Sequence, residues 1–559
     1  MKLFCNGLFS LGAVLTSAVV AQDHNDRFVP IADLGYVKYK GTTNTTSGLN
    51  LFYGIPFAQP PVGELRWRKP RPIESRNNFS GKTVDATKMA PECYQSEPYS
   101  LYVGAPVPFL HGMGTSYWDE GESQSEDCLY LNVKTPKKPV SSSLPVVVQI
   151  HGGGYTQGSA QSSPGDALVH ESNGKIIYVE IQYRLGFFGF LAGSEVKQNG
   201  DLNAGLLDQR AALEWVQRNI KAFGGDPSRV TIWGGSAGGG SVSYQLIAGG
   251  AFDQPPFSAA IPEFPWWQPL QSPSVQEHQY YDALHLADCK NLDCLRSKPS
   301  SELQFINQRV ENNSYPGPGD GFGVFYWGPV VDGKFIRQLP DQEFKQGNFH
   351  HVPLMLDREA YEGYIFSNQT ITTMAEETMD AENLFPSAGP AFFSRLYKLY
   401  PRSSFNSTFF QRQTWFGDFI INCPTYYMAT ARTDGGPAVN NSAVFKLIFA
   451  AGTEEHAATA AFLTSSEIGF PAANNHTLAQ IMANYWISFA VKHDPNPLRY
   501  ESAPFWPSYS SGGKGTVQQG DGVGFDVLRV NYAEIISEKD EDAGPQCDFF
   551  SSHGYTVEN

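Results

Sequence analysis

The chain has 559 residues, of which 41% are hydrophobic and 17% are charged, and it contains 10 Trp, 27 Tyr and 38 Phe. This composition excludes a disordered protein, because disordered chains are highly charged and poor in aromatic residues. The formal net charge of -16 argues against a nucleic-acid partner, since phosphate binding needs a basic surface. A folded protein is therefore predicted, either one large enzyme domain or roughly two to four smaller ones.

The N-terminus has the pattern of a secretory signal peptide. Residues 1–21, MKLFCNGLFSLGAVLTSAVVA, carry one basic residue, then a short apolar run, then small residues. A membrane anchor is the alternative, but the apolar run is interrupted and shorter than the roughly 20 residues that span a bilayer. We expect cleavage after Ala21, which predicts a secreted, extracellular protein of residues 22–559 without stable membrane insertion.

Six of the seven cysteines remain after this cleavage. An even set in an oxidising compartment predicts three disulfides, and spacing alone leaves the pairing open apart from a local preference for Cys289 with Cys294. Asn-x-Ser/Thr sequons in a secreted chain are candidate glycosylation sites on surface loops. They begin at Asn44, Asn78, Asn312, Asn368, Asn406, Asn440 and Asn475.

The middle of the chain alternates strand and helix patterns, and no repeat or long linker divides it. Leu144–Ile150 and Lys175–Tyr183 are continuous β-branched runs, typical of strands buried on both faces. Leu206–Ile220 has apolar residues near helical spacing, and Val230–Trp233 follows as a further strand. This order predicts an α/β fold in one domain, with a doubly wound parallel sheet whose reactive groups lie at the carboxyl ends of the strands.

A candidate nucleophile stands directly after the last of these strands. Gly234–Gly238 reads GGSAG, the G-x-S-x-G pattern in which a tight strand-to-helix turn exposes the serine hydroxyl. A glycine-rich turn without chemistry is the alternative, but the flanking strand and helix favour Ser236 as nucleophile.

The candidate oxyanion donors follow the strand Leu144–Ile150. His151–Tyr155 reads HGGGY, a loop whose backbone amides can point at a tetrahedral intermediate. We assign Gly153, Gly154 and Ala237 to the oxyanion hole. Phosphate binding is the alternative, but the loop lacks the lysine of a P-loop. His151 precedes the glycines, where a structural role is predicted.

Taken together, these patterns resemble the type-B carboxylesterase and lipase family of cholinesterase-like α/β-hydrolases, and within it the secreted fungal carboxylesterases and lipases. The resemblance covers nearly everything after Phe28 and includes GIPFAQPPVGELRW from Gly54, SEDCLYLNV from Ser125, YRLGFFGFL from Tyr183 and GPVVDGKFI from Gly328. It implies an α/β-hydrolase fold, with a mostly parallel central sheet flanked by helices, and a Ser, Glu or Asp, His triad in chain order.

The resemblance places the acid of this triad at Glu362, in VPLMLDREAYEGYIF from Val352. Asp357 and Glu359 are its nearby competitors. The sequence departs from the family pattern here, with Asp357 where glycine is usual and Tyr361 where aspartate is common.

The base is placed at His456, in AGTEEHAATAAFL from Ala451. Here Ala457 stands where glycine is typical, and Thr459 stands where an acid often sits. His476, inside a sequon, and His493, in KHDPNP, are the competing histidines.

The resemblance also chooses among the disulfide pairings and implies two scaffold ion pairs. The implied disulfides are Cys93 with Cys128, Cys289 with Cys294, and Cys423 with Cys547. The implied ion pairs are Arg66 with Glu126 and Arg184 with Asp208.

We expect a serine carboxylic-ester hydrolase that works through an acyl-enzyme on small-molecule or lipid-like esters, with no metal and no cofactor. In this family the loop between Cys93 and Cys128 can form a lid. Trp266 and Trp267 either wall a substrate pocket or belong to the core. Members that act on choline esters usually carry glutamate before the serine, so Gly235 argues against choline esters.

Two other functions fit the same fold. A catalytically silent adhesion or binding module would need the triad to be lost, whereas here all three residues are present. A peptidase is compatible with the triad, but no specificity pocket can be recognised in the sequence.

Overall fold

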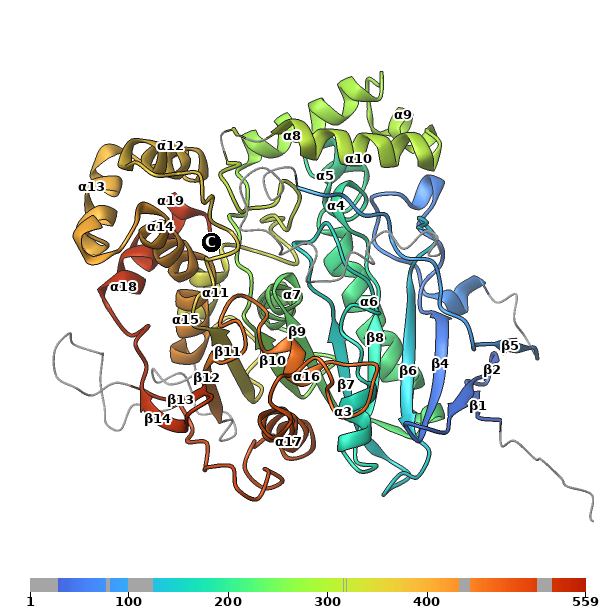
Figure 1. The fold of residues 1–559 in the computed structure, drawn as a ribbon. Helices are drawn as coiled ribbons and strands as arrows, with labels where there is room; N and C mark the ends of the chain where they lie inside the picture. The colour runs from blue at the N-terminus through green and yellow to red at the C-terminus, as the bar shows by residue number, and fades with distance from the viewer. Residues whose placement is uncertain are drawn as a thin grey trace, which may run out of the picture.

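The computed structural model describes residues 29–76, 81–98, 124–314, 316–317, 319–431, 443–509 and 525–559. Within these residues, eleven strands form one sheet (Figure 1). Their order across the sheet is β14 (Ile535–Lys539), β13 (Asp526–Asn531), β12 (Val444–Ala450), β11 (Leu354–Glu359), β10 (Ala259–Glu263), β9 (Gly225–Gly235), β7 (Leu144–Ile150), β8 (Ile177–Ile181), β6 (Tyr130–Pro136), β4 (Leu49–Pro56) and β3 (Thr42–Asn44). A separate small sheet contains β1 (Ile31–Asp33), β2 (Lys38–Lys40) and β5 (Thr83–Asp85).

The centre of the large sheet is parallel, from β8 through β7, β9, β10, β11 and β12 to β13. Every residue of β7 and β8 is buried, as expected for strands covered on both faces. The prediction for β7 has the observed bounds. The predicted strand Lys175–Tyr183 extends beyond β8 at both ends. At its C-terminal end, Gln182 and Tyr183 are still buried although the strand has ended, so the sequence pattern continues past it.

Helices cover both faces of the sheet and bury two separate clusters of apolar side chains. On one face lie α6 (Ala204–Asn219) and α7 (Ala237–Ile247), and on the other lie α3 (Asp166–Glu171) and α17 (His476–Lys492) (Figure 1). The predicted helix Leu206–Ile220 corresponds to α6. This is the α/β-hydrolase architecture in one domain, so the predicted fold class is confirmed.

Further helices surround these four. Along the top of Figure 1 lie α8 (Pro273–Leu286), α9 (Leu292–Ser297) and α10 (Ser300–Ser314), with α5 (Ser194–Asn199) and α4 (Gly186–Phe190) below them. The others are α11 (Pro340–Lys345), α12 (Met374–Leu384), α13 (Pro390–Leu399), α14 (Thr408–Gly417), α15 (Cys423–Ala431), α16 (Ala460–Leu463), α18 (Pro545–Ser552) and α19 (Gly554–Val557).

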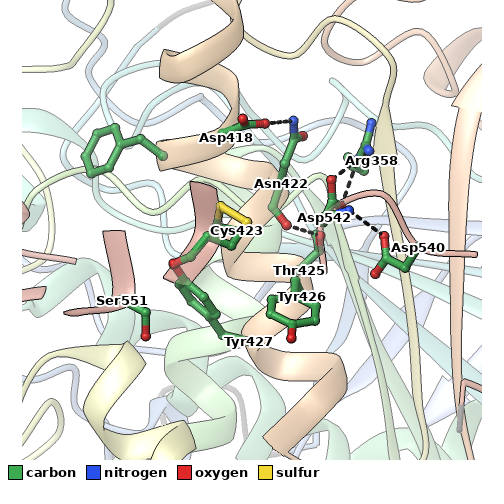
Figure 2. The surroundings of a disulfide bond; sticks show 12 residues. Arg358, Asp418, Asn422, Cys423, Thr425, Tyr426, Tyr427, Asp540, Asp542 and Ser551 are labelled. Atoms are coloured by element: carbon green, nitrogen blue, oxygen red, sulfur yellow. Dashed lines mark hydrogen bonds and ion pairs between the residues drawn. A yellow bond between two sulfur atoms is a disulfide. The ribbon is translucent and has the colours of Figure 1, made fainter. Parts of the chain in front are cut away.

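Three disulfides and two buried ion pairs join distant segments. The disulfides are Cys93–Cys128, Cys289–Cys294 and Cys423–Cys547. The ion pairs are Arg66–Glu126 at 2.6 Å and Arg184–Asp208 at 2.7 Å. All are the pairs that the family resemblance implies. Around Cys423 in α15, Figure 2 shows Tyr427 and Ser551 on one side and Arg358, Asp540 and Asp542 on the other.

Candidate active site

The nucleophile turn joins β9 to α7 at the carboxyl edge of the sheet. Ser236 has φ 60° and ψ -128°, a strained conformation that non-glycine residues rarely adopt. Its backbone N–H donates to the carbonyl of Glu263 at 3.2 Å, and its carbonyl accepts from the N–H groups of Gly240 at 2.8 Å and Trp266 at 3.0 Å. A Cβ on Gly238 would lie 2.1 Å from the carbonyl oxygen of Ile150, so glycine is required there.

The HGGGY loop passes directly beside this turn, because β7 and β9 are neighbours in the sheet. A Cβ on Gly152 would lie 3.1 Å from the Cβ of Ser236. Gly153 and Gly154 have φ of 104° and 63°, which favours glycine. Ala237 is the first residue of α7, so its N–H is one of the amides that a helix start leaves without an intrahelical partner. The three expected oxyanion donors therefore belong to segments that flank Ser236.

His456 and Glu362 form a direct hydrogen bond, in which Nδ1 of His456 lies 2.6 Å from Oε2 of Glu362. Glu362 follows β11, His456 follows β12, and these strands are neighbours in the sheet. Both side chains are buried. Burial penalises each charged form, so it lowers the pKa of His456 to about 4 and raises the pKa of Glu362 to about 7.

His456 and Ser236 line one cavity of about 960 Å³. The ring of Phe264 lies close to both segments. Its centroid is 5.0 Å from the ring centroid of His456. Its Cζ atom would be 2.5 Å from a Cβ on Gly235, the residue before Ser236. Nε2 of His456 is buried without a hydrogen-bond partner among the described residues. Hydrogen bonds to a catalytic base are often long in an unliganded site and shorten when substrate binds. An unpartnered Nε2 is therefore consistent with a His456 that accepts a hydrogen bond from the Ser236 hydroxyl once substrate is bound.

The competing acids and bases have other surroundings. The carboxylate of Asp357 is buried and has no hydrogen-bond partner in the described structure, whereas Glu359 accepts from Thr459. His476 is exposed, with Nδ1 3.1 Å from the carbonyl of Gly469, and His493 ends α17 in a left-handed conformation. Neither histidine lines the cavity of Ser236.

His151 is buried, stacks on Tyr183 at 4.3 Å between ring centroids, and has a pKa lowered to about 4 by burial. It too lies outside the cavity lining, as a structural residue would.

Glu263 is a cavity residue that the sequence patterns did not single out. It ends β10, beside Gly235 in the sheet, and Nε1 of Trp233 donates to its Oε2 at 2.8 Å. Burial, and next the charge of Glu359, raise the pKa of Glu263 to about 8. An acidic residue at the end of an apolar strand, IPE before FPWW, is the one signal that could have drawn attention to it.

Trp266 and Trp267 are both fully buried and belong to the apolar core. The Trp266 ring lies 6.0 Å from that of His456, so it packs behind the base without lining the cavity. Of the sequon asparagines, Asn406 is exposed, and Asn44, Asn368 and Asn475 are half-buried. Asn312 lies in α10, and Asn78 and Asn440 lie outside the described residues, as do residues 1–21 and residues 99–123 of the expected lid.

The described residues contain neither a metal site nor a membrane-spanning helix. Within these ranges, no three His, Cys, Asp or Glu side chains are grouped so as to hold a metal ion. Nor do they include a helix with both the length and the apolar character needed to cross a membrane.

The fold and this arrangement of loops define an α/β-hydrolase. Residues 30–522 match the model of the carboxylesterase family, and the chain belongs to that family. Its activity is carboxylic-ester hydrolysis.

Named relatives match most of the chain. Carboxylesterase patB of Penicillium expansum is 29% identical over 533 residues, which cover 87% of this chain and 91% of the relative. Secreted lipase 1 of Botryotinia fuckeliana is 32% identical over 564 residues, covering 92% and 94%. The solved structure of Aspergillus niger EstA superposes with a TM-score of 0.79 at 28% identity, covering 95% of this chain and 99% of that one.

Proposed function

We propose that the protein hydrolyses carboxylic esters through an acyl-enzyme on Ser236. His456 removes the hydroxyl proton as the serine oxygen attacks the ester carbonyl, and then donates that proton to the departing alcohol. Water attacks the acyl-enzyme with the same proton transfers in reverse order, which releases the acid and restores Ser236. The hydrogen bond of 2.6 Å between His456 and Glu362, at the cavity that also contains Ser236, is the observation that supports this best.

Glu362 orients the imidazole and stabilises the imidazolium that forms in each transition state. The N–H groups of Gly153, Gly154 and Ala237 stabilise the oxyanion of the tetrahedral intermediates. The glycine loop directly follows β7, and α7 begins directly after the turn that follows β9, so the paired strands bring the three amides to the same edge of the sheet.

We propose that the substrates are esters that include lipid-like ones. The cavity is large enough for a drug-sized ester and has a mixed lining. Ala460, Ala461 and Phe462 supply apolar surface, and Ser162 and Asn474 supply polar groups. The relative whose name includes "lipase" supports the same choice.

Secretion is also proposed. The three disulfides fit an oxidising compartment, and a relative carries the name "Secreted lipase 1". The seven sequons are then proposed glycosylation sites, of which Asn406 has the most exposed side chain among those described.

The test compares wild type with Ser236→Ala on nitrophenyl esters of graded chain length, triolein, a sterol ester and a feruloyl ester. We expect the variant to lose nearly all turnover on every substrate that the wild type hydrolyses. Wild-type turnover by the variant would contradict the assignment of the nucleophile. A wild type active only on short nitrophenyl esters would contradict the lipid-like preference and leave the ester hydrolase standing.

A further inference from the structure

Four carboxyl groups lie together behind the catalytic histidine. Strand β11 alternates its side chains between the two faces of the sheet, so Asp357 and Glu359 share one face and Arg358 points to the other. Glu263 is the residue of β10 paired with Asp357, and Glu362 follows on the next turn. All four carboxyl groups are buried. The triad mechanism uses only Glu362 and leaves the other three unexplained.

Glu359 differs from the other two in its contacts. Its Oε1 accepts from the N–H of Thr459 at 3.0 Å and from the Oγ1 hydroxyl of Thr459 at 2.8 Å. Its own backbone N–H donates to Oε1 of Glu362 at 2.6 Å. One residue therefore contacts both the loop that carries His456 and the carboxylate that accepts from His456.

The loop of His456 is held on both sides of the histidine. Before it, the N–H of Tyr361 donates to the carbonyl of Glu454 at 2.9 Å, a bond between backbones that any sequence could make. After it, the bonds of Thr459 to the Glu359 side chain are the corresponding link. This second link depends on side chains, so substitution can remove it.

Resting on the proposed function, we propose that Glu359 is a positioning residue of the triad. It fixes Thr459 and the Glu362 turn in one unit, so that Nδ1 of His456 stays in line with Glu362 and the ring stays at the cavity that contains Ser236. A displacement of about 1 Å at a reacting group can lower a rate by about a hundredfold, so such a link matters for turnover.

The electrostatics of the site agree with this role. Burial, and next the charge of Glu362, raise the pKa of Glu359 well above its ordinary value, which favours the protonated form of the carboxyl group. Asp357 and Glu263 face the same space, while Arg358 and Asp542 lie beyond the strand. In its protonated form, Glu359 accepts from Thr459 without placing a second negative charge beside Glu362.

Asp357 offers a matched control. It lies on the same strand and face as Glu359 and is equally buried, but its carboxyl oxygens accept no hydrogen bond from the described residues. Asp357→Asn therefore changes a buried carboxyl without breaking a side-chain link.

The experiment measures kcat and KM on a nitrophenyl ester, together with Tm, for a small set of variants. We expect Glu359→Ala to lower kcat about 10- to 100-fold with little change in KM, because substrate still binds. Glu359→Gln keeps an acceptor oxygen for Thr459 and should restore kcat to within about threefold of wild type. Asp357→Asn should leave kcat within about twofold.

Two further measurements separate positioning from stability. The downfield proton resonance of the bond between His456 and Glu362 should move or broaden in Glu359→Ala and stay in place in Asp357→Asn. Thr459→Val removes the hydroxyl and keeps the N–H, so it should lower kcat by about tenfold, with Thr459→Ser as its rescue. If Glu359→Ala does not fold, this Thr459 pair decides the question.

The proposal is overturned if Glu359→Ala has wild-type kcat, or if Asp357→Asn lowers kcat as much. An unmoved proton resonance in Glu359→Ala would also overturn it. Failure of the proposed function would give another result, which is wild-type turnover by Ser236→Ala. That result does not depend on the turnover of the Glu359 variants.

Discussion

Gly154 illustrates how single atoms shape the oxyanion loop. A Cβ at this position would lie 2.1 Å from the ring of Phe325, and the residue has φ 63°. Gly154→Ala must therefore shift the loop or the ring, and with it the amide proposed as an oxyanion donor. We expect kcat to fall about 100- to 1000-fold with a smaller change in KM, measured on a nitrophenyl ester.

The control for this substitution is Gly347→Ala. Gly347 has φ 72°, but nothing lies within 4 Å of its added Cβ. It shares the backbone strain without the clash, so kcat should stay at the wild-type value. Equal losses of kcat in the two variants would show that backbone strain alone explains the effect.

The pH dependence of the reaction follows from the pair of His456 and Glu362. Burial lowers the pKa of His456 to about 4, so the imidazole is a neutral base throughout the neutral range. Burial raises the pKa of Glu362 to about 7, and only its ionised form stabilises the imidazolium. Thus kcat/KM should rise with pH and level off above about 7.

A pH–rate profile at constant ionic strength checks this expectation. In Glu362→Gln the remaining activity should lose that dependence, because the titrating carboxyl is gone. An acidic limb centred near pH 4 in the wild type would instead assign the limiting ionisation to His456.

At the scale of elements, the Cys423–Cys547 disulfide fastens helix α18, near the C-terminus, to α15. It closes a loop with a sequence separation of 124, whereas Cys289 and Cys294 are separated by 5. In the loop-entropy model, removal of the long-range disulfide with Cys423→Ser and Cys547→Ser lowers the free energy of unfolding by about 4 to 5 kcal/mol.

The corresponding double variant at Cys289 and Cys294 should cost only about 2 kcal/mol. Denaturant unfolding of both double variants gives the comparison. A larger loss from the short disulfide would refute the entropic explanation.

The elements differ in how far the sequence determines them. The run LPVVVQI predicted β7 with its observed bounds, because a strand buried on both faces leaves an unbroken apolar pattern. The nucleophile turn and the glycine loop are also local in sequence. Glu362 and His456 come from loops after different strands, so their contact depends on sheet order, and only family resemblance could point to both residues.

The contact of Glu359 with Thr459 was beyond prediction for the same reason. Glu359 appeared only as a competing acid, and Thr459 only as a departure from the family pattern. Their bond joins residues 100 positions apart, one at the end of β11 and the other in the loop that follows the neighbouring strand β12. Nothing in either local sequence marks one residue as the partner of the other.

At the scale of the whole molecule, a buried charge cluster ties the C-terminal segment to the sheet. Nζ of Lys446 in β12 is fully buried and lies 2.7 Å from Asp540 and 2.6 Å from Asp542. Asp542 also binds Arg358 (Figure 2). Lys446→Met leaves these carboxylates partly unpaired and should lower the free energy of unfolding by about 3 to 5 kcal/mol.

The control is the exposed pair of Lys539 and Asp526 at 2.9 Å. Lys539→Met should cost less than about 1 kcal/mol, because solvent screens an exposed pair. Denaturant unfolding measures both variants, and similar costs for the two would contradict the importance of burial.

The central claim is that Ser236 carries the acyl group, and covalent labelling tests it most directly. The protein is treated with a fluorophosphonate probe, and the adduct is located by mass spectrometry of its peptides. The account predicts one adduct, on Ser236, that is absent in Ser236→Ala and forms much more slowly in His456→Ala. An adduct on another residue, or no adduct on an enzyme that is hydrolysing esters, would contradict it.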